Sequence, residues 1–260
     1  MKSPLVVFDR LSLWVGERQF LRNVELTVEE GERLLICGGP GSGKSFLLRL
    51  ILGLPGMGRA DEVRYSGAVR ARGLSLLEAA SGPLQQWRRE VGAVLRGGCL
   101  IDNMDIRRNI TLPLYYHCGE LFSSEQIERR CSFLMELLGI GHLDQPGLRP
   151  VALDPEERVR AALARALIGQ PCLLLLDDPV AGLGEEAAFR LLPFFSSRPE
   201  FDDGIQTHDR TETPFSCLVT TTDDRAYGDW ADRRAALEGG SVRMIGTADR
   251  TDFYGDPDEG

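Results

Sequence analysis

The stretch GGPGSGKS at residues 38–45 decides the fold. It satisfies the pattern G-x-x-x-x-G-K-[ST] in full, and the short apolar run RLLIC (33–37) precedes it. The segment SFLLRLILGL that follows has the three- and four-residue spacing of apolar positions that is typical of a helix. A buried strand, a glycine-rich turn and a helix in this order predict a phosphate-binding loop.

Each residue type in this loop has a chemical task. The glycines let backbone N–H groups close around phosphate oxygens, and the helix N-terminus adds positive potential. Lys44 reaches the β- and γ-phosphates, and the hydroxyl of Ser45 is a ligand for Mg²⁺. The predicted nucleotide-binding residues are Gly38, Gly39, Pro40, Gly41, Ser42, Gly43, Lys44 and Ser45.

A second stretch, LLLLDDPVAGLG (173–184), has the pattern of a buried strand that delivers two carboxylates to its end. Mg²⁺ prefers hard oxygen ligands, so Asp177 is the predicted second metal ligand. The alternative is that this aspartate only caps the turn that follows. The task of the second carboxylate, Asp178, is the open question.

Composition limits the classes of function. The chain has 260 residues, 43% of them hydrophobic, which is enough for a folded core. The formal charge of −9 repels phosphate backbones, so we expect no nucleic-acid partner. The six cysteines show no zinc-binding spacing and are expected to be reduced thiols. No apolar run is long enough to cross a membrane, so membrane association is expected to need a partner protein.

The pattern along the chain predicts an α/β fold. The first 30 residues indicate a small β layer, and residues 83–148, including WRREVGAVL, show helical spacing. Helices and buried strands then alternate through EERVRAALARALIG, CLLLLDD, EEAAFRLLPFF and SCLVTT, which favours a largely parallel sheet. We therefore expect one domain over 1–247, with a polar insert at 198–214 and an acidic, flexible tail at 248–260.

These motifs, together with ALARALIGQPCLLLLDDP, resemble the ATP-binding subunits of ABC transporters over about residues 5–245. The resemblance implies ATP and Mg²⁺ as ligands and a P-loop, RecA-like core with an antiparallel β subdomain. It also implies a helical subdomain, at about 83–165, that docks on an integral membrane permease. It places an adenine-stacking aromatic at Trp14; on residues alone, Trp14 is a half-buried strand aromatic.

A narrower resemblance concerns the transported molecule. GGCLIDNMDIRRNITLPLYYH (97–117) is similar to the corresponding region of ATPases from Mla/Mce-type lipid-transport systems. It implies a lipid or phospholipid substrate. The expected location is the cytoplasmic face of the cell membrane, reached through the permease.

Several catalytic positions depart from the family pattern. Asp178 stands where the family has the glutamate that polarises the attacking water, and its carboxylate is withdrawn by about 1.5 Å. Arg96 replaces a glutamine; its guanidinium has no acceptor atom for a metal, but it could pair with a γ-phosphate or be a solvated surface side chain. Thr222 replaces the switch histidine and cannot carry its charge. Gly184 replaces an aspartate.

The largest departure is LDPEE (153–157) at the position of the LSGGQ signature. Asp154 has the properties of an N-cap, Pro155 of a first helical residue, and Glu157 of the capping-box partner. Carboxylates at this position also repel a triphosphate. The sequence therefore predicts a helix N-terminus that satisfies itself instead of binding the nucleotide of an opposite subunit.

Two mechanisms stay open for the predicted ATP-binding subunit. In one, the chain is a weak ATPase, working as a homodimer. In the other, it is a nucleotide-holding regulatory or scaffold subunit, in a heterodimer with an active ATPase. A soluble P-loop kinase or GTPase is a third class; the chain lacks the NKxD guanine-reading motif, and ARALIGQPCLLLLDDP has no place in a kinase.

Overall fold

The computed structural model describes residues 3–55, 63–117, 121–201 and 214–246. They form two compact units, of which unit 1 takes residues 1–84 and 218–260 and unit 2 takes residues 85–217. The predicted acidic tail and most of the predicted polar insert lie outside the described residues. No described helix is long and apolar enough to cross a membrane.

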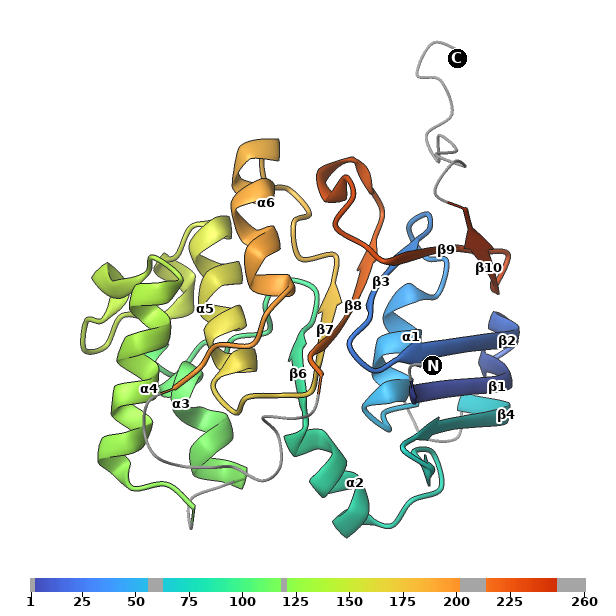
Figure 1. The fold of residues 1–260 in the computed structure, drawn as a ribbon, viewed down its shortest axis with the longest axis horizontal. Coiled ribbons are helices and arrows are strands. Elements are labelled where there is room, and N and C mark those ends of the chain that lie inside the picture. Colours follow the sequence, from blue (N-terminus) through green and yellow to red (C-terminus); the bar gives the residue numbers. More distant parts are fainter. Residues whose placement is uncertain (1–2, 56–62, 118–120, 202–213, 247–260) are drawn as a thin grey trace. The chain divides into compact units, whose positions relative to one another are not determined.

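Unit 1 contains an antiparallel sheet with the strand order β2-β1-β4-β5. Its strands are β1 (Pro4–Val15), β2 (Arg18–Glu29), β4 (Val63–Ala71) and β5 (Leu74–Ser75). Figure 1 shows β1, β2 and β4 side by side. Leu11, Leu13 and Val24 are fully buried, because alternate side chains of these strands face the interior. The small β layer predicted from the first 30 residues is confirmed, and β4 and β5 complete it.

The second group of strands in unit 1 carries the phosphate loop. β3 (Arg33–Cys37) pairs in parallel with β9 (Arg233–Glu238), and β9 pairs antiparallel with β10 (Ser241–Ile245). β8 (Ser216–Thr221) completes the order β10-β9-β3-β8. Helix α1 (Lys44–Ile51) follows β3 after the loop, so the predicted strand, turn and helix are confirmed.

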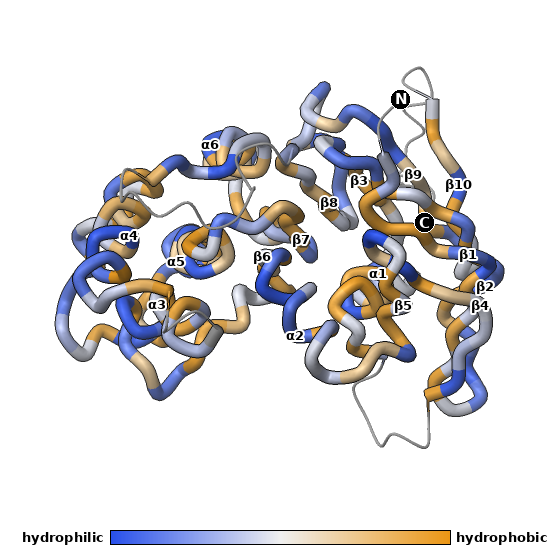
Figure 2. Tube along the Cα trace, turned by 60° about the horizontal axis from the view of Figure 1, so that its bottom comes forward, coloured by the Kyte–Doolittle hydropathy of each residue, from blue (hydrophilic) through white to orange (hydrophobic). Residues whose placement is uncertain are grey.

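Unit 2 combines two parallel strands with helices. β6 (Val91–Val94) pairs with β7 (Leu173–Asp177), all five residues of which are buried. The helices are α2 (Ser81–Arg89, which starts in unit 1), α3 (Ile106–His117), α4 (Ser124–Leu137), α5 (Pro155–Leu167) and α6 (Glu185–Leu191). Figure 2 shows hydrophilic and hydrophobic residues alternating around α3, α4 and α5, as expected of helices with one buried face. α3 contacts both α4 and α5.

The expectation of a helix through WRREVGAVL was wrong in its second half. The helix ends at Arg89, and VGAV forms β6. A Cβ atom at Gly92 would lie 2.4 Å from the carbonyl oxygen of Ala166 in α5, so the strand packs against that helix more closely than a side chain allows. Pairing with β7 thus overrides the local helical spacing, because the two valines also favour a pleated strand.

Asn109 holds the segment that leads into α3. Its side chain is fully buried; Oδ1 accepts from the N–H of Ile101 at 2.6 Å, and Nδ2 donates to the carbonyls of Ile101, Met104 and Asp105 at 3.0–3.2 Å. One amide therefore satisfies backbone groups along the whole of residues 101–105. This segment keeps a defined shape without regular secondary structure.

We predict that Asn109→Ala lowers the free energy of unfolding by about 2–4 kcal/mol, because it leaves several backbone groups without their partners. Asn103→Ala, at an exposed position of the same segment, is the control and should stay within about 0.5 kcal/mol of wild type. Urea denaturation measures both values. Equal stabilities of the two variants would contradict the role given to Asn109.

Candidate functional site

The phosphate loop between β3 and α1 contains two glycines in a left-handed backbone conformation. Gly41 and Gly43 have φ of 71° and 108°, in the region that favours glycine. Gly43 is the N-cap of α1, and no side chain caps its N-terminus. The N–H of Gly38 donates to the carbonyl of Thr221 at 3.2 Å, which ties the start of the loop to the end of β8.

Lys44 folds back into the loop that precedes it. Its ammonium donates to the carbonyl of Gly38, to the carbonyl of Gly39 at 2.9 Å and towards the hydroxyl of Ser42 at 3.5 Å. The residue is only 7% exposed. A positive charge is thus held beside the N-terminus of α1, whose dipole also favours a bound anion.

Residues of β2 that the sequence analysis did not single out support the loop. The guanidinium of Arg18 lies 4.5 Å from the ring centroid of Phe20 and donates towards the carbonyl of Gly41 at 3.5 Å. Phe20 packs on Phe46 of α1, with ring centroids 4.8 Å apart. A prediction of the β1–β2 hairpin register, in which Val15 pairs with Arg18, could have identified Arg18 and Phe20 as neighbours of the loop.

Trp14 lies on the same hairpin, in β1, and is half-buried. It pairs with Gln19 of β2 and with Arg64 of β4. Trp14 and the phosphate loop both belong to unit 1.

Gly43 combines a positive φ with close neighbours. A Cβ atom there would lie 3.0 Å from the carbonyl oxygen of Phe20 and 3.2 Å from Leu21. We predict that Gly43→Ala costs about 1–3 kcal/mol of unfolding free energy, because it adds backbone strain to this crowding. Gly39→Ala, where a Cβ meets nothing within 4 Å, should change stability by less than about 0.5 kcal/mol. Thermal unfolding of the two variants side by side decides the point; equal midpoints would refute it.

The two carboxylates lie in unit 2. Asp177 ends β7 and is 5% exposed, and Asp178 follows it and is 8% exposed. Asp178 has a φ of 52°, a left-handed conformation that aspartate tolerates better than most residues with a side chain. The strand β7 thus delivers both carboxylates, nearly buried, to its C-terminal end, as the sequence pattern predicts.

Arg96 is brought to Asp178 in unit 2, as the sequence could not show. Its Nη2 lies 4.0 Å from Oδ2 of Asp178, and its side chain is 68% exposed against 5% for the aspartate.

Thr222 lies in unit 1, directly after β8, where the hydroxyl of its neighbour Thr221 donates to the carbonyl of Asp223 at 2.7 Å. Gly184 is the N-cap of α6.

The signature position has the predicted capping box. Glu157 N–H donates to Oδ1 of Asp154 at 2.8 Å, and Asp154 N–H donates to Oε2 of Glu157 at 3.0 Å. His142 bonds the other carboxylate oxygen of Glu157 at 2.8 Å and holds the pKa of that carboxyl below its usual value, with help from the Asp154 N–H. The N-terminus of α5 is thus capped by the side chains of Asp154 and Glu157.

The third carboxylate of this stretch, Glu156, is also occupied. It accepts from Arg160 of the same helix at 2.6 Å and from Arg190 of α6 at 3.0 Å. The hydrogen bonds from Arg160 hold the pKa of Glu156 below its ordinary value. The negative charges that LDPEE brings to this position are therefore engaged within unit 2.

We predict that Asp154→Ala destabilises the chain by about 1 kcal/mol, the usual cost of removing an N-cap. Asp102→Ala, at an exposed position, is the control and should have little effect. Chemical denaturation measures both. A stability loss no larger than that of the control would mean that the capping box contributes nothing to α5.

The described residues of unit 2 line two hollows of different size. The larger, about 620 Å³, is a groove lined by Met104, Asp105, Arg107, Arg108, Thr111, Leu112, Tyr115, Glu128, Asp144, Gln145 and Pro146. Arg107 of α3 forms ion pairs with two other residues of the groove lining, Asp144 and, at 2.5 Å, Glu128 of α4. These bonds raise the pKa of Arg107 and lower that of Asp144.

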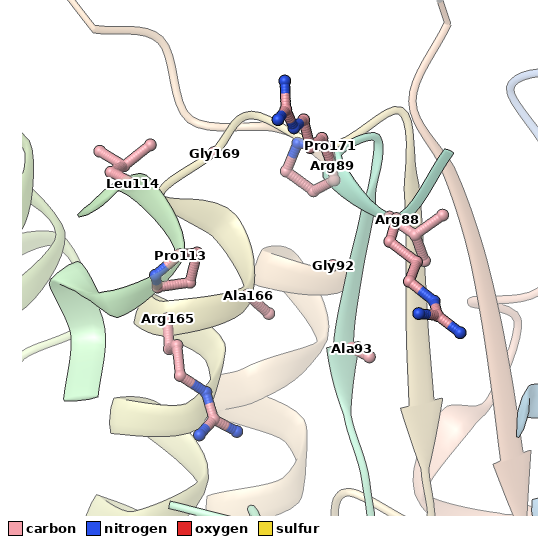
Figure 3. A pocket seen from close by; sticks show the side chains of 11 residues that line it. Arg88, Arg89, Gly92, Ala93, Pro113, Leu114, Arg165, Ala166, Gly169 and Pro171 are labelled. Atoms are coloured by element: carbon pink, nitrogen blue, oxygen red, sulfur yellow. The ribbon is translucent and has the colours of Figure 1, made fainter. Parts of the chain in front are cut away.

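The smaller hollow, about 170 Å³, has three arginines on its wall, but their guanidinium groups do not converge on it (Figure 3). The guanidinium groups of Arg88, Arg89 and Arg165 point away from one another (Figure 3). That of Arg165 donates instead to the carbonyls of Gly98 and Cys99, each at 2.8 Å. A bound anion would need converging donors.

Comparison with known proteins identifies the family. A family model described as ABC transporter matches residues 21–181. The chain belongs to the ABC transporter family. A lipoprotein-releasing system ATP-binding protein of Alcanivorax borkumensis is 30% identical, over 88% of this chain and 91% of the relative. A probable amino-acid ABC transporter ATP-binding protein of Sinorhizobium fredii is 26% identical, over 96% and 92%.

Relatives with other transport functions are equally similar, and a solved structure shows the fold. A sulfate/thiosulfate import ATP-binding protein of Caulobacter vibrioides is 33% identical over 90% of this chain and 63% of its own length. A dimeric ATP-binding cassette in a post-hydrolysis state, bound to ADP and Pi, superposes with a TM-score of 0.74 at 23% identity, over 92% and 97% of the two chains. The predicted ABC ATPase fold is therefore confirmed.

Proposed function

We propose that this ABC-family chain is the ATP-binding subunit of a transporter and binds MgATP through residues 38–45. The observation that carries the proposal is the position of Lys44, whose ammonium is held among loop carbonyls at the start of α1. The loop glycines that crowding and positive φ require are also present. Trp14 is proposed to stack on the adenine.

The donors available in the chain suit Mg²⁺ as well. Ser45 offers a hydroxyl and Asp177 a carboxylate, and both are the hard oxygen ligands that this ion prefers. We assign these two residues to the metal. When bound, Mg²⁺ neutralises charge on the β- and γ-phosphates. Lys44 and the loop N–H groups orient the same phosphates.

Hydrolysis by this subunit is proposed to be weak. Asp178 is one methylene shorter than a glutamate, and a misplacement of about 1 Å can slow a reaction on the order of a hundredfold. Thr222 cannot supply the charge of a histidine. Arg96 has no acceptor oxygen for a metal or a water proton. The substitutions at 178 and 222 both weaken the catalytic groups that the family pattern supplies, and Arg96 cannot act as the metal ligand that a glutamine is.

The capping box favours a second candidate, a nucleotide-holding subunit paired with an active ATPase. The capping box engages the N–H groups of Asp154 and Glu157, at the helix start where a signature sequence would meet a partner's γ-phosphate. In a mixed dimer, this chain would hold a nucleotide in its own loop and receive an intact signature from the other subunit. The same chain would contribute little to the partner's nucleotide.

Steady-state hydrolysis separates these two candidates. We predict that the purified chain hydrolyses MgATP below about 1 s⁻¹, against a median of about 10 s⁻¹ for enzymes in general. Lys44→Ala, which removes the phosphate clamp, is the background control. A rate above that background would make Asp178 a working carboxylate, and equal rates would favour the nucleotide-holding subunit. A rate of several tens per second would contradict weakened hydrolysis.

The proposed partner is an integral membrane permease that docks on residues 100–110, which would place the chain on the cytoplasmic side of the membrane. This segment is held by Asn109 and forms one wall of the 620 Å³ groove. Lipid transport is proposed for the complex. The similarity to a lipoprotein-releasing ATPase supports it, although importers of small anions and amino acids are similarly related.

Adjacent tyrosines test the docking surface. Tyr115 lines the groove and is 48% exposed, whereas Tyr116 is 76% exposed and does not line it. We predict that Tyr115→Ser reduces co-purification of the chain with integral membrane proteins from detergent-solubilised cells by at least about tenfold, as loss of a buried aromatic contact does. Tyr116→Ser should co-purify as wild type does. Equal recovery of both variants would place the docking surface elsewhere.

A further inference from the structure

An exposed arginine of β2 lies on the phosphate loop and has no carboxylate partner in the part of the chain that the structure describes. The guanidinium of Arg18 donates towards the carbonyl of Gly41, which is itself exposed. No described carboxylate is within ion-pair distance of Arg18, not even that of its neighbour Glu17. Arg33 of the same unit, by contrast, pairs with Asp232 at 2.7 Å. The polar contact of Arg18 is therefore with a backbone dipole and not with an opposite charge.

The ring of Phe20 holds this guanidinium in place. The centre of the guanidinium lies 4.5 Å from the ring centroid, which is a cation–π contact. Phe20 in turn packs on Phe46 of α1, with ring centroids 4.8 Å apart. The long side chain of Arg18 thus rests on a ring that contacts the helix beginning at Lys44. Because the side chain is already placed, less rotational freedom is lost when it binds a ligand.

The positions of the two cations along the loop indicate which phosphates Arg18 faces. The ammonium of Lys44 lies at the carbonyls of Gly38 and Gly39, at the start of the loop. Arg18 lies further along, where a Cβ atom on Gly41 would be 3.8 Å from its Nη2. In loops of this kind the lysine reaches the β- and γ-phosphates, and the backbone N–H groups surround the α- and β-phosphates. We therefore expect Arg18 beside the phosphates that ATP and ADP share.

A phosphate oxygen is a better acceptor for this guanidinium than the carbonyl of Gly41. The distance of 3.5 Å between Arg18 and that carbonyl is long for a hydrogen bond. A bond from a guanidinium to a phosphate is charge-assisted and about twice as strong as a neutral one. Since the chain has a formal charge of −9, a cation at the loop also offsets the repulsion of an anionic nucleotide.

We propose that Arg18 is a further nucleotide-binding residue, whose guanidinium donates to an α- or β-phosphate oxygen of bound ATP or ADP. The proposal rests on the proposed function, because it concerns the ligand of the same loop. Arg18 and the loop both belong to unit 1, so the contact needs no residue of unit 2. The loop then has two cations, Lys44 buried inside it and Arg18 exposed on it.

The rival role for Arg18 is structural support of the loop through the carbonyl of Gly41. Arg18→Gln separates the two roles, because glutamine can still donate to a carbonyl but has no charge. Arg18→Lys keeps the charge and loses the planar group that stacks on Phe20. If support of the loop is the only role, Arg18→Gln binds nucleotide as the wild type does.

Titration with fluorescent ADP and with a fluorescent, non-hydrolysable ATP analogue, each with Mg²⁺, tests the proposal. We expect Arg18→Gln to weaken binding of both nucleotides about three- to tenfold, between the effect of an exposed ion pair and that of a charged hydrogen bond. Arg18→Lys should weaken it less than about threefold. Arg22→Gln is the matched control, since Arg22 is an exposed arginine of the same strand for which the described residues show no side-chain contact with the loop. It should bind as the wild type does.

Two further readouts identify a purely structural effect. The thermal unfolding midpoint of Arg18→Gln without nucleotide should lie within about 2 °C of the wild-type value, because the residue is exposed. Added salt should weaken nucleotide binding more in the wild type than in Arg18→Gln, because salt screens a charge that the variant lacks.

Each outcome decides between the two roles. Wild-type affinity for both nucleotides in Arg18→Gln overturns the proposal and leaves the proposed function standing. A loss restricted to the ATP analogue also overturns it, because it would place Arg18 at the γ-phosphate. A loss that comes with a lower unfolding midpoint and an unchanged salt dependence overturns it in favour of loop support. A wild-type chain that binds neither nucleotide overturns the proposed function as well.

Discussion

The left-handed turn at Gly43 is the constraint on which the phosphate loop depends. It turns the chain from β3 into α1 at a point where a Cβ atom would lie 3.0 Å from the carbonyl oxygen of Phe20. Because the turn comes one residue before Lys44, it sets both the direction of the lysine and the open N-terminus of the helix. Two residues of β2 then support the loop and the helix. Arg18 donates towards the carbonyl of Gly41, and Phe20 packs on Phe46 of α1.

The N-termini of α1 and α5 follow opposite rules. α1 starts without a side-chain cap, so no side chain competes with a ligand for its N-terminus. α5 starts with a reciprocal capping box and a proline, so the N–H of Glu157 is used by Asp154 and the first helical residue has none. One helix end is built to receive phosphate and the other is built to need none. This contrast is the physical reason why we propose nucleotide binding by this chain but weak hydrolysis.

Much of the fold could be predicted from the sequence because its signals are local. The loop 38–45 and the strand 173–177 have specific residue types at fixed spacing, and the capping box at 154–157 is a pattern of four residues. VGAV was misassigned because its strand is set by pairing with β7 and by contact with α5, which lie more than 60 residues away. The local spacing of apolar residues cannot predict those long-range contacts.

The candidate site was predictable residue by residue but not as contacts. The substitutions at Arg96 and Asp178 were evident, whereas their proximity depends on where β6 and β7 end in one unit. Arg18, Phe20 and Arg165 carry no motif, and only the strand register and the packing of α5 give them a role. Their importance follows from tertiary structure, which sequence patterns report poorly.

The central claim is that the loop at 38–45 binds MgATP, and titration of a fluorescent ATP analogue tests it most directly. Wild type and Lys44→Ala are compared with and without Mg²⁺. The account predicts saturable, Mg²⁺-dependent binding by the wild type and at least about tenfold weaker binding by Lys44→Ala, the loss expected for one charged hydrogen bond. Equal affinity of the two proteins, or no saturable binding by the wild type, would contradict it.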